Sequence, residues 1–137
     1  MSASLVQNRW LFQHFTLAMD QAVLTNFIEN GIPQKAGSLS LNINVSTILS
    51  PIFLEFDQTC RRTAEDKIIL ELNQIDIFDD LPAYKFACNF LRLRGYAICV
   101  DGVTHLTFPF IDRESLGADF IKIVWSADMA GNREDNL

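Results

Sequence analysis

The sequence predicts an α/β fold in which parallel strands alternate with helices. Segments with the pattern of a strand begin near residues 39, 67, 96 and 120 of the 137-residue chain, and helix-like segments lie between them. This spacing is close to the ~30 residues of a strand–helix–strand unit, which joins parallel strands by a right-handed crossover. In addition, each strand carries one polar residue near its C-terminal half, where a fully buried parallel strand is apolar.

The first expected element is an amphipathic helix over residues 7–30. An apolar residue recurs at every fourth position, at Leu11, Phe15, Met19 and Val23, and Leu24, Phe27 and Ile28 widen this stripe. Gly31 and Pro33 end the pattern. An aromatic helix of this kind can pack on its own domain, on a membrane or on a partner. Its polar side carries acidic and amide groups rather than lysines, which favours packing over membrane binding. These groups belong to Gln13, Asp20 and Glu29.

Residues 38–125 are expected to form the β/α units. Alternating apolar and polar residues predict strands over 38–46, 67–73, 96–101 and 120–125. One helix is expected to begin after Ser50, the N-cap, with Pro51 in its first turn. A second opens at Asp80 and ends at Gly95. A loop with a short helix is expected over 102–117, and a frayed tail over 126–137. The chain is thus expected to be one domain over residues 1–137.

Composition and charge exclude several classes of protein. Hydrophobic residues make up 49% of the chain and the net charge is −6, so it is globular and a poor ligand for a nucleic-acid polymer or an anionic membrane. Three cysteines without paired spacing are expected to be buried thiols in a reducing compartment. Neither a secretory signal nor a membrane span is evident, so a cytoplasmic location is predicted.

The polar residues on the four strands form a candidate site. They are Asn44, Glu71, Asp101 and Lys122. Parallel strands bring such residues to one edge, where α/β barrels build their sites. Two carboxylates and an amide oxygen suit magnesium, manganese or calcium, and a lysine beside them can orient a phosphate or a water. The alternative is a structural network in which the lysine pairs with an acid and the asparagine is hydrogen-bonded beside them.

Four short segments between Ser40 and Lys122 resemble, in order, the motifs of the EAL domain family. Residues 44–46, Asn-Val-Ser, resemble its N-x-S. Residues 70–74, Leu-Glu-Leu-Asn-Gln, resemble its E-x-T-E strand. The interval from Gly95 to Asp101 is similar to the run into its D-D-F-G-x-G loop, and residues 118–123, Ala-Asp-Phe-Ile-Lys-Ile, are similar to D-x-x-K-I-D.

The resemblance implies a bacterial (β/α) TIM-barrel-like fold that linearises cyclic di-GMP with two divalent metals. It assigns Asn44, Glu71 and Asp101 as metal ligands and Lys122 as a partner of the metal or its water. An eight-stranded barrel needs ~250 residues, so the expected fold is a partial barrel. The chain is then either part of a longer protein or a half-barrel that needs a partner.

The sequence also departs from the family. It has no E-A/V-L motif, and the second Glu of E-x-T-E is Gln74. Gly102 replaces the second Asp of D-D-F-G, and Val124 replaces the Asp of K-I-D. Thr104 and Leu106 replace the loop glycines, which changes the backbone path. His105 could act as a substitute ligand, but a loop histidine is usually solvated.

Two-metal cleavage needs both ions held, so we expect no catalytic residues, no enzyme activity and no cofactor, with Mg or Mn at most at a vestigial site. The leading hypothesis is a degenerate EAL-like module for protein interaction or dimerisation in cyclic di-GMP signalling. The alternative is a receptor that binds cyclic di-GMP without hydrolysis.

The half-barrel also predicts a homodimer. Its barrel-side apolar residues would have no second half to cover them: Ile69, Ala97, Cys99, Phe120 and Val124. Such a patch favours association through an interface above the ~800 Å² of crystal contacts. The first helix, with Trp10, Phe12 and Phe15, is the second candidate surface.

Overall fold

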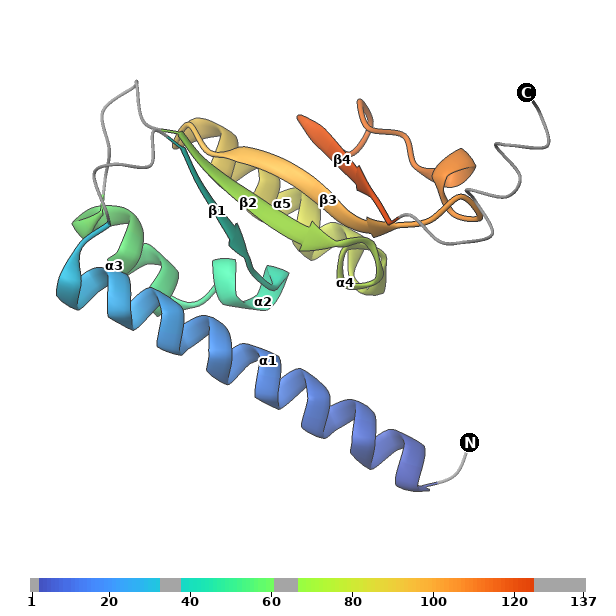
Figure 1. The fold of residues 1–137 in the computed structure, drawn as a ribbon, viewed down its shortest axis with the longest axis horizontal. Helices are drawn as coiled ribbons and strands as arrows, with labels where there is room; N and C mark the ends of the chain where they lie inside the picture. Colours follow the sequence, from blue (N-terminus) through green and yellow to red (C-terminus); the bar gives the residue numbers. More distant parts are fainter. Residues whose placement is uncertain (1–2, 33–37, 61–66, 125–137) are drawn as a thin grey trace.

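The computed structural model describes residues 3–32, 38–60 and 67–124. It confirms the α/β fold: four parallel strands lie side by side in the order β1-β2-β3-β4 (Figure 1). Their bounds are β1 Ser38–Asn42, β2 Lys67–Asn73, β3 Ala97–Val103 and β4 Phe120–Ile123. In the part of the chain that is described, these strands form an open sheet and do not close into a barrel.

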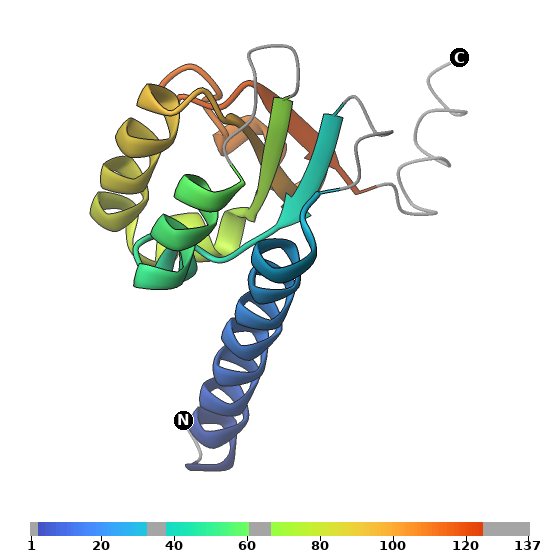
Figure 2. The same ribbon diagram turned by 90° about the vertical axis from the view of Figure 1, so that its left-hand side faces the viewer.

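Helices cover one face of this sheet and enclose the core. Helices α3 (Pro51–Thr59) and α5 (Leu81–Leu93) lie on the same side of the strands (Figure 2). Ser50 and Pro51 occupy the N-cap and first turn of α3, as predicted, and Asp80 caps α5 by accepting from the Ala83 N–H. The inner face of α5 is buried, at Tyr84, Ala87, Cys88 and Leu91. It packs with buried strand residues such as Leu70, Leu72, Ile98 and Val100.

Helix α1 (Ala3–Asn30) packs on α3 and on α2 (Val45–Ile48) through its C-terminal half. The N-terminal half extends away from the sheet and the other helices (Figures 1 and 2). The helix exists as predicted, but it packs through only part of the predicted apolar stripe. Leu24 is buried, with Phe27 and Ile28 half-buried beside it. The other four side chains of the stripe are exposed, at 56% for Leu11, 60% for Phe15, 52% for Met19 and 42% for Val23.

The first strand is shorter than the predicted 38–46. It ends at Asn42, and Asn44 is the N-cap of the short helix α2. The apolar residues Ile43, Val45 and Ile48 are all buried, but Val45 and Ile48 are buried from a helical turn. Side chains from other elements bond the backbone here: Asp20 accepts from the Asn44 N–H, and Asp76 from the Val45 N–H.

Other boundaries also differ from the prediction. Helix α4 (Gln74–Asp79) follows β2 directly and was not predicted; Asn73 caps it by accepting from the Ile75 N–H. Strand β3 continues to Val103 through Gly102, where its pairing with β4 is irregular. Strand β4 ends at Ile123, and Trp125 and the predicted tail lie outside the described residues. The expected short helix is η2 (Phe108–Phe110).

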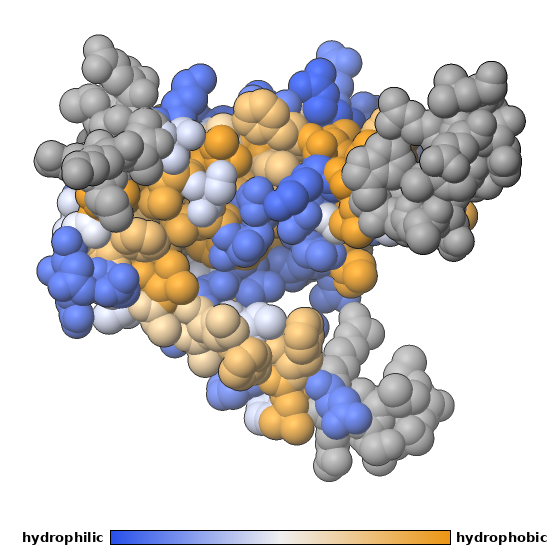
Figure 3. All heavy atoms as spheres, in the orientation of Figure 1, coloured by the Kyte–Doolittle hydropathy of each residue, from blue (hydrophilic) through white to orange (hydrophobic). Residues whose placement is uncertain are grey.

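The opposite face of the sheet is more polar than predicted. Strand registers place Asn42, Glu71 and Cys99 in one row across it, with Phe120 beside Cys99. Of the predicted apolar residues, Cys99 is buried and Ile69 and Ala97 are half-buried, whereas Phe120 and Val124 are about half exposed. Figure 3, which views this face, shows hydrophilic surface at its centre. The face therefore carries a smaller apolar patch than the half-barrel hypothesis requires.

Candidate functional site

Three of the four predicted site residues line one groove. Asn44, Glu71 and Asp101 face a hollow of about 500 Å³ between α1 and the C-terminal ends of β1, β2 and β3. The α1 wall of the groove consists of Thr16, Met19, Asp20 and Val23. The parallel strands thus bring these residues together, as the sequence pattern predicted. Lys122 lies beside them, with its Nζ atom 3.7 Å from Oε1 of Glu71.

The contact between Glu71 and Lys122 is a partly solvated ion pair. The Glu71 side chain is 15% exposed and that of Lys122 is 59% exposed. An exposed pair of this kind contributes about 0–1 kcal/mol, so it neutralises the carboxylate more than it stabilises the fold. The pairing is the one that the structural-network interpretation expected. Asp101 makes a local contact, accepting from the Gly102 N–H at 2.8 Å.

Cys99 lies in the same row of the sheet as Glu71, and its environment makes it a poor nucleophile. Burial raises the pKa of the Cys99 thiol, and the negative charges of Glu71 and Asp101 raise it further. The opposing effect of Lys122 is smaller. A thiol held in its protonated form is inert toward electrophiles and metals.

Asn44 is held by Asp20, a residue that the sequence analysis placed only on the polar side of the first helix. One carboxylate oxygen of Asp20 accepts three hydrogen bonds of 2.8 Å: two from Asn44, by its backbone N–H and its Nδ2 atom, and one from the Thr47 hydroxyl. These bonds fasten α1 to the start of α2. The sequence signal for this role is the spacing, because Asp20 shares a helical face with the packing residues Leu24 and Phe27.

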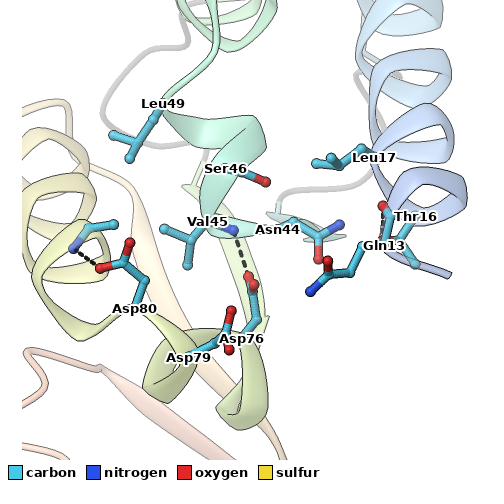
Figure 4. Close-up of a pocket in the computed structure, with 11 residues that line it drawn as sticks. Gln13, Thr16, Leu17, Asn44, Val45, Ser46, Leu49, Asp76, Asp79 and Asp80 are labelled. Carbon is cyan, nitrogen blue, oxygen red and sulfur yellow. Dashed lines mark hydrogen bonds between the residues drawn. The ribbon is translucent and has the colours of Figure 1, made fainter. Parts of the chain in front are cut away.

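A second, acidic groove of about 480 Å³ lies on the other side of Asn44 (Figure 4). Asp76, Asp79 and Asp80 line it, together with parts of α1 and α2. Asp76 accepts from the Val45 N–H at 2.7 Å, and Asp80 caps α5. Burial raises the pKa of Asp76 despite the bond from Val45, and the charges of Asp79 and Asp20 add to the rise.

Two of the positions that depart from the EAL pattern contact each other. The Gln74 side chain, which is 9% exposed, donates from Nε2 to the Gly102 carbonyl at 3.0 Å. Gly102 has a φ of 76°, and a Cβ there would lie 2.7 Å from Nδ2 of Asn73. A glutamate carboxylate at 74 could not donate this bond, and any side chain at 102 would press on the α4 cap. The replacements at positions 74 and 102 are therefore structurally coupled.

The loop after β3 is closed by a pair of threonines. The Thr104 N–H donates to the Thr107 hydroxyl at 2.9 Å, and the Thr107 N–H donates to the Thr104 carbonyl at 3.2 Å. Thr104 and Leu106 occupy positions where the family has glycines, and Leu106 and His105 are exposed. The Thr107 N–H also donates to the Thr104 hydroxyl at 3.3 Å, a bond that a glycine at position 104 would lack.

Among the residues that the structure describes, there is no group of three or more His, Cys, Asp or Glu side chains arranged to hold a metal ion. The other histidine, His14, stacks on Trp10 with ring centroids 5.4 Å apart. None of the described helices combines the length and apolar character needed to cross a membrane.

Comparison of the chain with models of protein families, with curated proteins and with solved structures finds no match.

Proposed function

We propose that this chain is a non-catalytic, degenerate EAL-like module that acts by protein association in bacterial cyclic di-GMP signalling. The observation that carries the proposal is the exposed apolar surface of α1. From Trp10 to Phe15 every side chain of the helix is exposed, including three large aromatic rings. Figure 3 shows hydrophobic surface along this projecting helix. Patches of this kind on a folded domain mark interaction surfaces.

The arrangement of the groove supports a role without catalysis. Asn44 is bonded to Asp20, and Glu71 is paired with Lys122, so two of the residues that the resemblance assigns to metal already have protein partners. Gln74 and Gly102, at two further positions of the family motifs, are bonded to each other. Two-metal phosphodiester cleavage requires ligands that clamp both ions, and these contacts compete with that chemistry.

The alternative, a receptor that binds cyclic di-GMP without hydrolysis, is favoured by one observation. The groove of about 500 Å³ is large enough to accept part of a nucleotide and contains polar side chains. Its charge opposes an anionic ligand, because Asp20, Glu71 and Asp101 all line it. Binding of the two phosphodiester groups would then depend on a divalent cation that screens these carboxylates.

A hydrolysis assay with a parallel titration tests the proposal. We expect no turnover of cyclic di-GMP above buffer with excess Mg²⁺ or Mn²⁺, and no heat of binding by calorimetry with or without Mg²⁺. Turnover that disappears in Glu71→Ala would contradict the proposal. Binding without turnover that requires Mg²⁺ and weakens in Glu71→Ala would support the receptor instead. Phe86→Ala, on the exposed side of α5, is the matched control for folding.

A further inference from the structure

One face of α1 is apolar and exposed over residues 11–23. We call it the α1 stripe; its members are Leu11, Phe12, Phe15, Met19, Ala22 and Val23. All six are exposed, and the five larger side chains are between 42% and 68% exposed. At 100° per residue these positions lie within one sector of the helix, roughly opposite Asp20 and Leu24, which attach α1 to the rest of the domain. A helix that is apolar on both sides is normally covered on both sides.

The α1 stripe is symmetric about Leu17. Reversing the helix around this residue exchanges position 11 with 23, 12 with 22 and 15 with 19, so the stripe coincides with itself. An antiparallel pair of identical helices with this register therefore places stripe against stripe along its full length. A two-fold contact requires self-complementarity of this kind: where residue i of one copy meets residue j of the other, residue j of the first copy meets residue i of the second.

Side-chain size is also complementary in this register. The large residues Leu11, Phe12 and Phe15 of one helix meet Val23, Ala22 and Met19 of the other. In a parallel pair, phenylalanine would meet phenylalanine and alanine would meet alanine, which crowds one end and leaves a void at the other. Alternation of large and small side chains is the arrangement that fills a helix interface.

The exposed area is sufficient for a specific contact. An aromatic side chain covers about 150–250 Å² when fully buried, so each phenylalanine of the stripe offers about 100–150 Å². With Leu11, Met19 and Val23, two copies would remove on the order of 1,000 Å² from water, which reaches the lower limit of specific interfaces. Two members of the stripe, Met19 and Val23, also line the groove beside the strand ends, so the partner helix would run along the mouth of this groove.

We infer that the α1 stripe pairs with the same stripe of a second copy of this chain, in an antiparallel two-fold contact centred near Leu17. This inference rests on the proposed function and names the partner. It assigns the primary contact to α1 and not to the open face of the sheet.

Sedimentation velocity on the full chain and its variants tests the inference. We expect a dimer at tens of micromolar that becomes monomeric on dilution. Phe15→Glu, which places a charge at the centre of the contact in both copies, should weaken dimerisation by about 100-fold or more. Phe86→Glu, a matched change of an exposed phenylalanine on α5, should leave it unchanged, and circular dichroism should show both variants folded.

Helix direction is tested by a spin label on Asn8→Cys in a Cys60→Ser background, where the remaining cysteines are buried. We expect about 27 Å between the two labelled positions in the antiparallel pair, against about 10 Å in a parallel one. A wild-type chain that stays monomeric at 100 μM overturns the inference but leaves association with another protein open. A dimer that survives Phe15→Glu and is lost in Phe120→Glu also overturns it. Cyclic di-GMP turnover, in contrast, would overturn the proposed function.

Discussion

At the scale of single residues, one carboxylate determines how the first helix attaches. Asp20 accepts bonds from the Asn44 backbone, the Asn44 side chain and the nearly buried Thr47 hydroxyl. Hydrogen bonds to a charged acceptor are stronger than neutral ones, and donors left without a partner lose solvation as well. The Asp20 hydrogen bonds therefore contribute more to the attachment of α1 than the half-buried apolar residues beside them.

Replacing Asp20 with alanine should destabilise the domain. The change leaves three donors without their acceptor, so we expect the free energy of unfolding to fall by about 3 kcal/mol in urea titrations. Glu29→Ala removes an exposed acid from the same helix and should change stability by less than about 0.5 kcal/mol. Equal effects of the two substitutions would show that the Asp20 contacts do not hold the helix.

Asp76 should make stability depend on pH. Burial raises its folded-state pKa, so the charged form is disfavoured in the native protein. The energetic cost of burying the charged carboxylate is absent at pH values below the ordinary carboxyl pKa, and it is fully present above the raised folded-state pKa. Asp76→Asn keeps an acceptor for the Val45 N–H without the charge. We expect this variant to be more stable than wild type at pH 7 by about 0.5 kcal/mol, with no advantage at pH 3. A stability gain in Asp76→Asn that is equal at pH 7 and at pH 3 would contradict burial of the charge as its cause.

At the scale of elements, the segment from β2 to the end of β3 departs from the EAL pattern as a unit. Gln74 begins α4 and donates to Gly102, which lies in β3 with left-handed backbone geometry. An acid introduced at one of these positions would therefore disturb the other.

Gln74→Glu should consequently destabilise the fold without creating activity. A carboxylate at position 74 would be buried against the Gly102 carbonyl and could not donate a hydrogen bond to it. We therefore expect the free energy of unfolding to fall by about 2 kcal/mol at pH 7. Gln21→Glu, an exposed change in the middle of α1, is the control and should be nearly neutral. The combination of Gln74→Glu with Gly102→Asp should still show no hydrolysis. Activity regained in that double variant would contradict this account of the site.

The sequence predicted the elements well where burial follows one face. Strand β2 has its predicted bounds, because its buried and less buried residues alternate without interruption. The end of β1 was misplaced because the spacing of Ile43, Val45 and Ile48 fits both a strand end and a helical turn. Helix α4 was missed because its six residues are too few to show helical periodicity.

The candidate site was predicted in part for a similar reason. Asn44, Glu71 and Asp101 gather in one groove because parallel strands end at a common edge. The spacing of Asp20 from Leu24 and Phe27 places it on the packed face of α1, but its partners, Asn44 and Thr47, depend on how the helix docks. The contact between Gln74 and Gly102 could not be predicted either, because the two residues are 28 positions apart in the sequence.

At the scale of the whole molecule, two features support the proposed association. The groove residues are partnered within the chain, and the largest exposed apolar surface among the described helices lies along α1. The projecting half of this helix has few tertiary contacts of its own, so it should fray in a monomer and become protected in a complex. Self-association through α1 is the central claim of the inferred dimer.

Amide hydrogen exchange at about 1 and 100 μM protein tests this claim most directly. The expected result is slower exchange over residues 8–23 at the higher concentration, with α5 unchanged, because the N-terminal half of α1 gains a partner while the core does not. Identical exchange over residues 8–23 at both concentrations, or protection confined to β4 and its neighbours on the open face of the sheet, would contradict it.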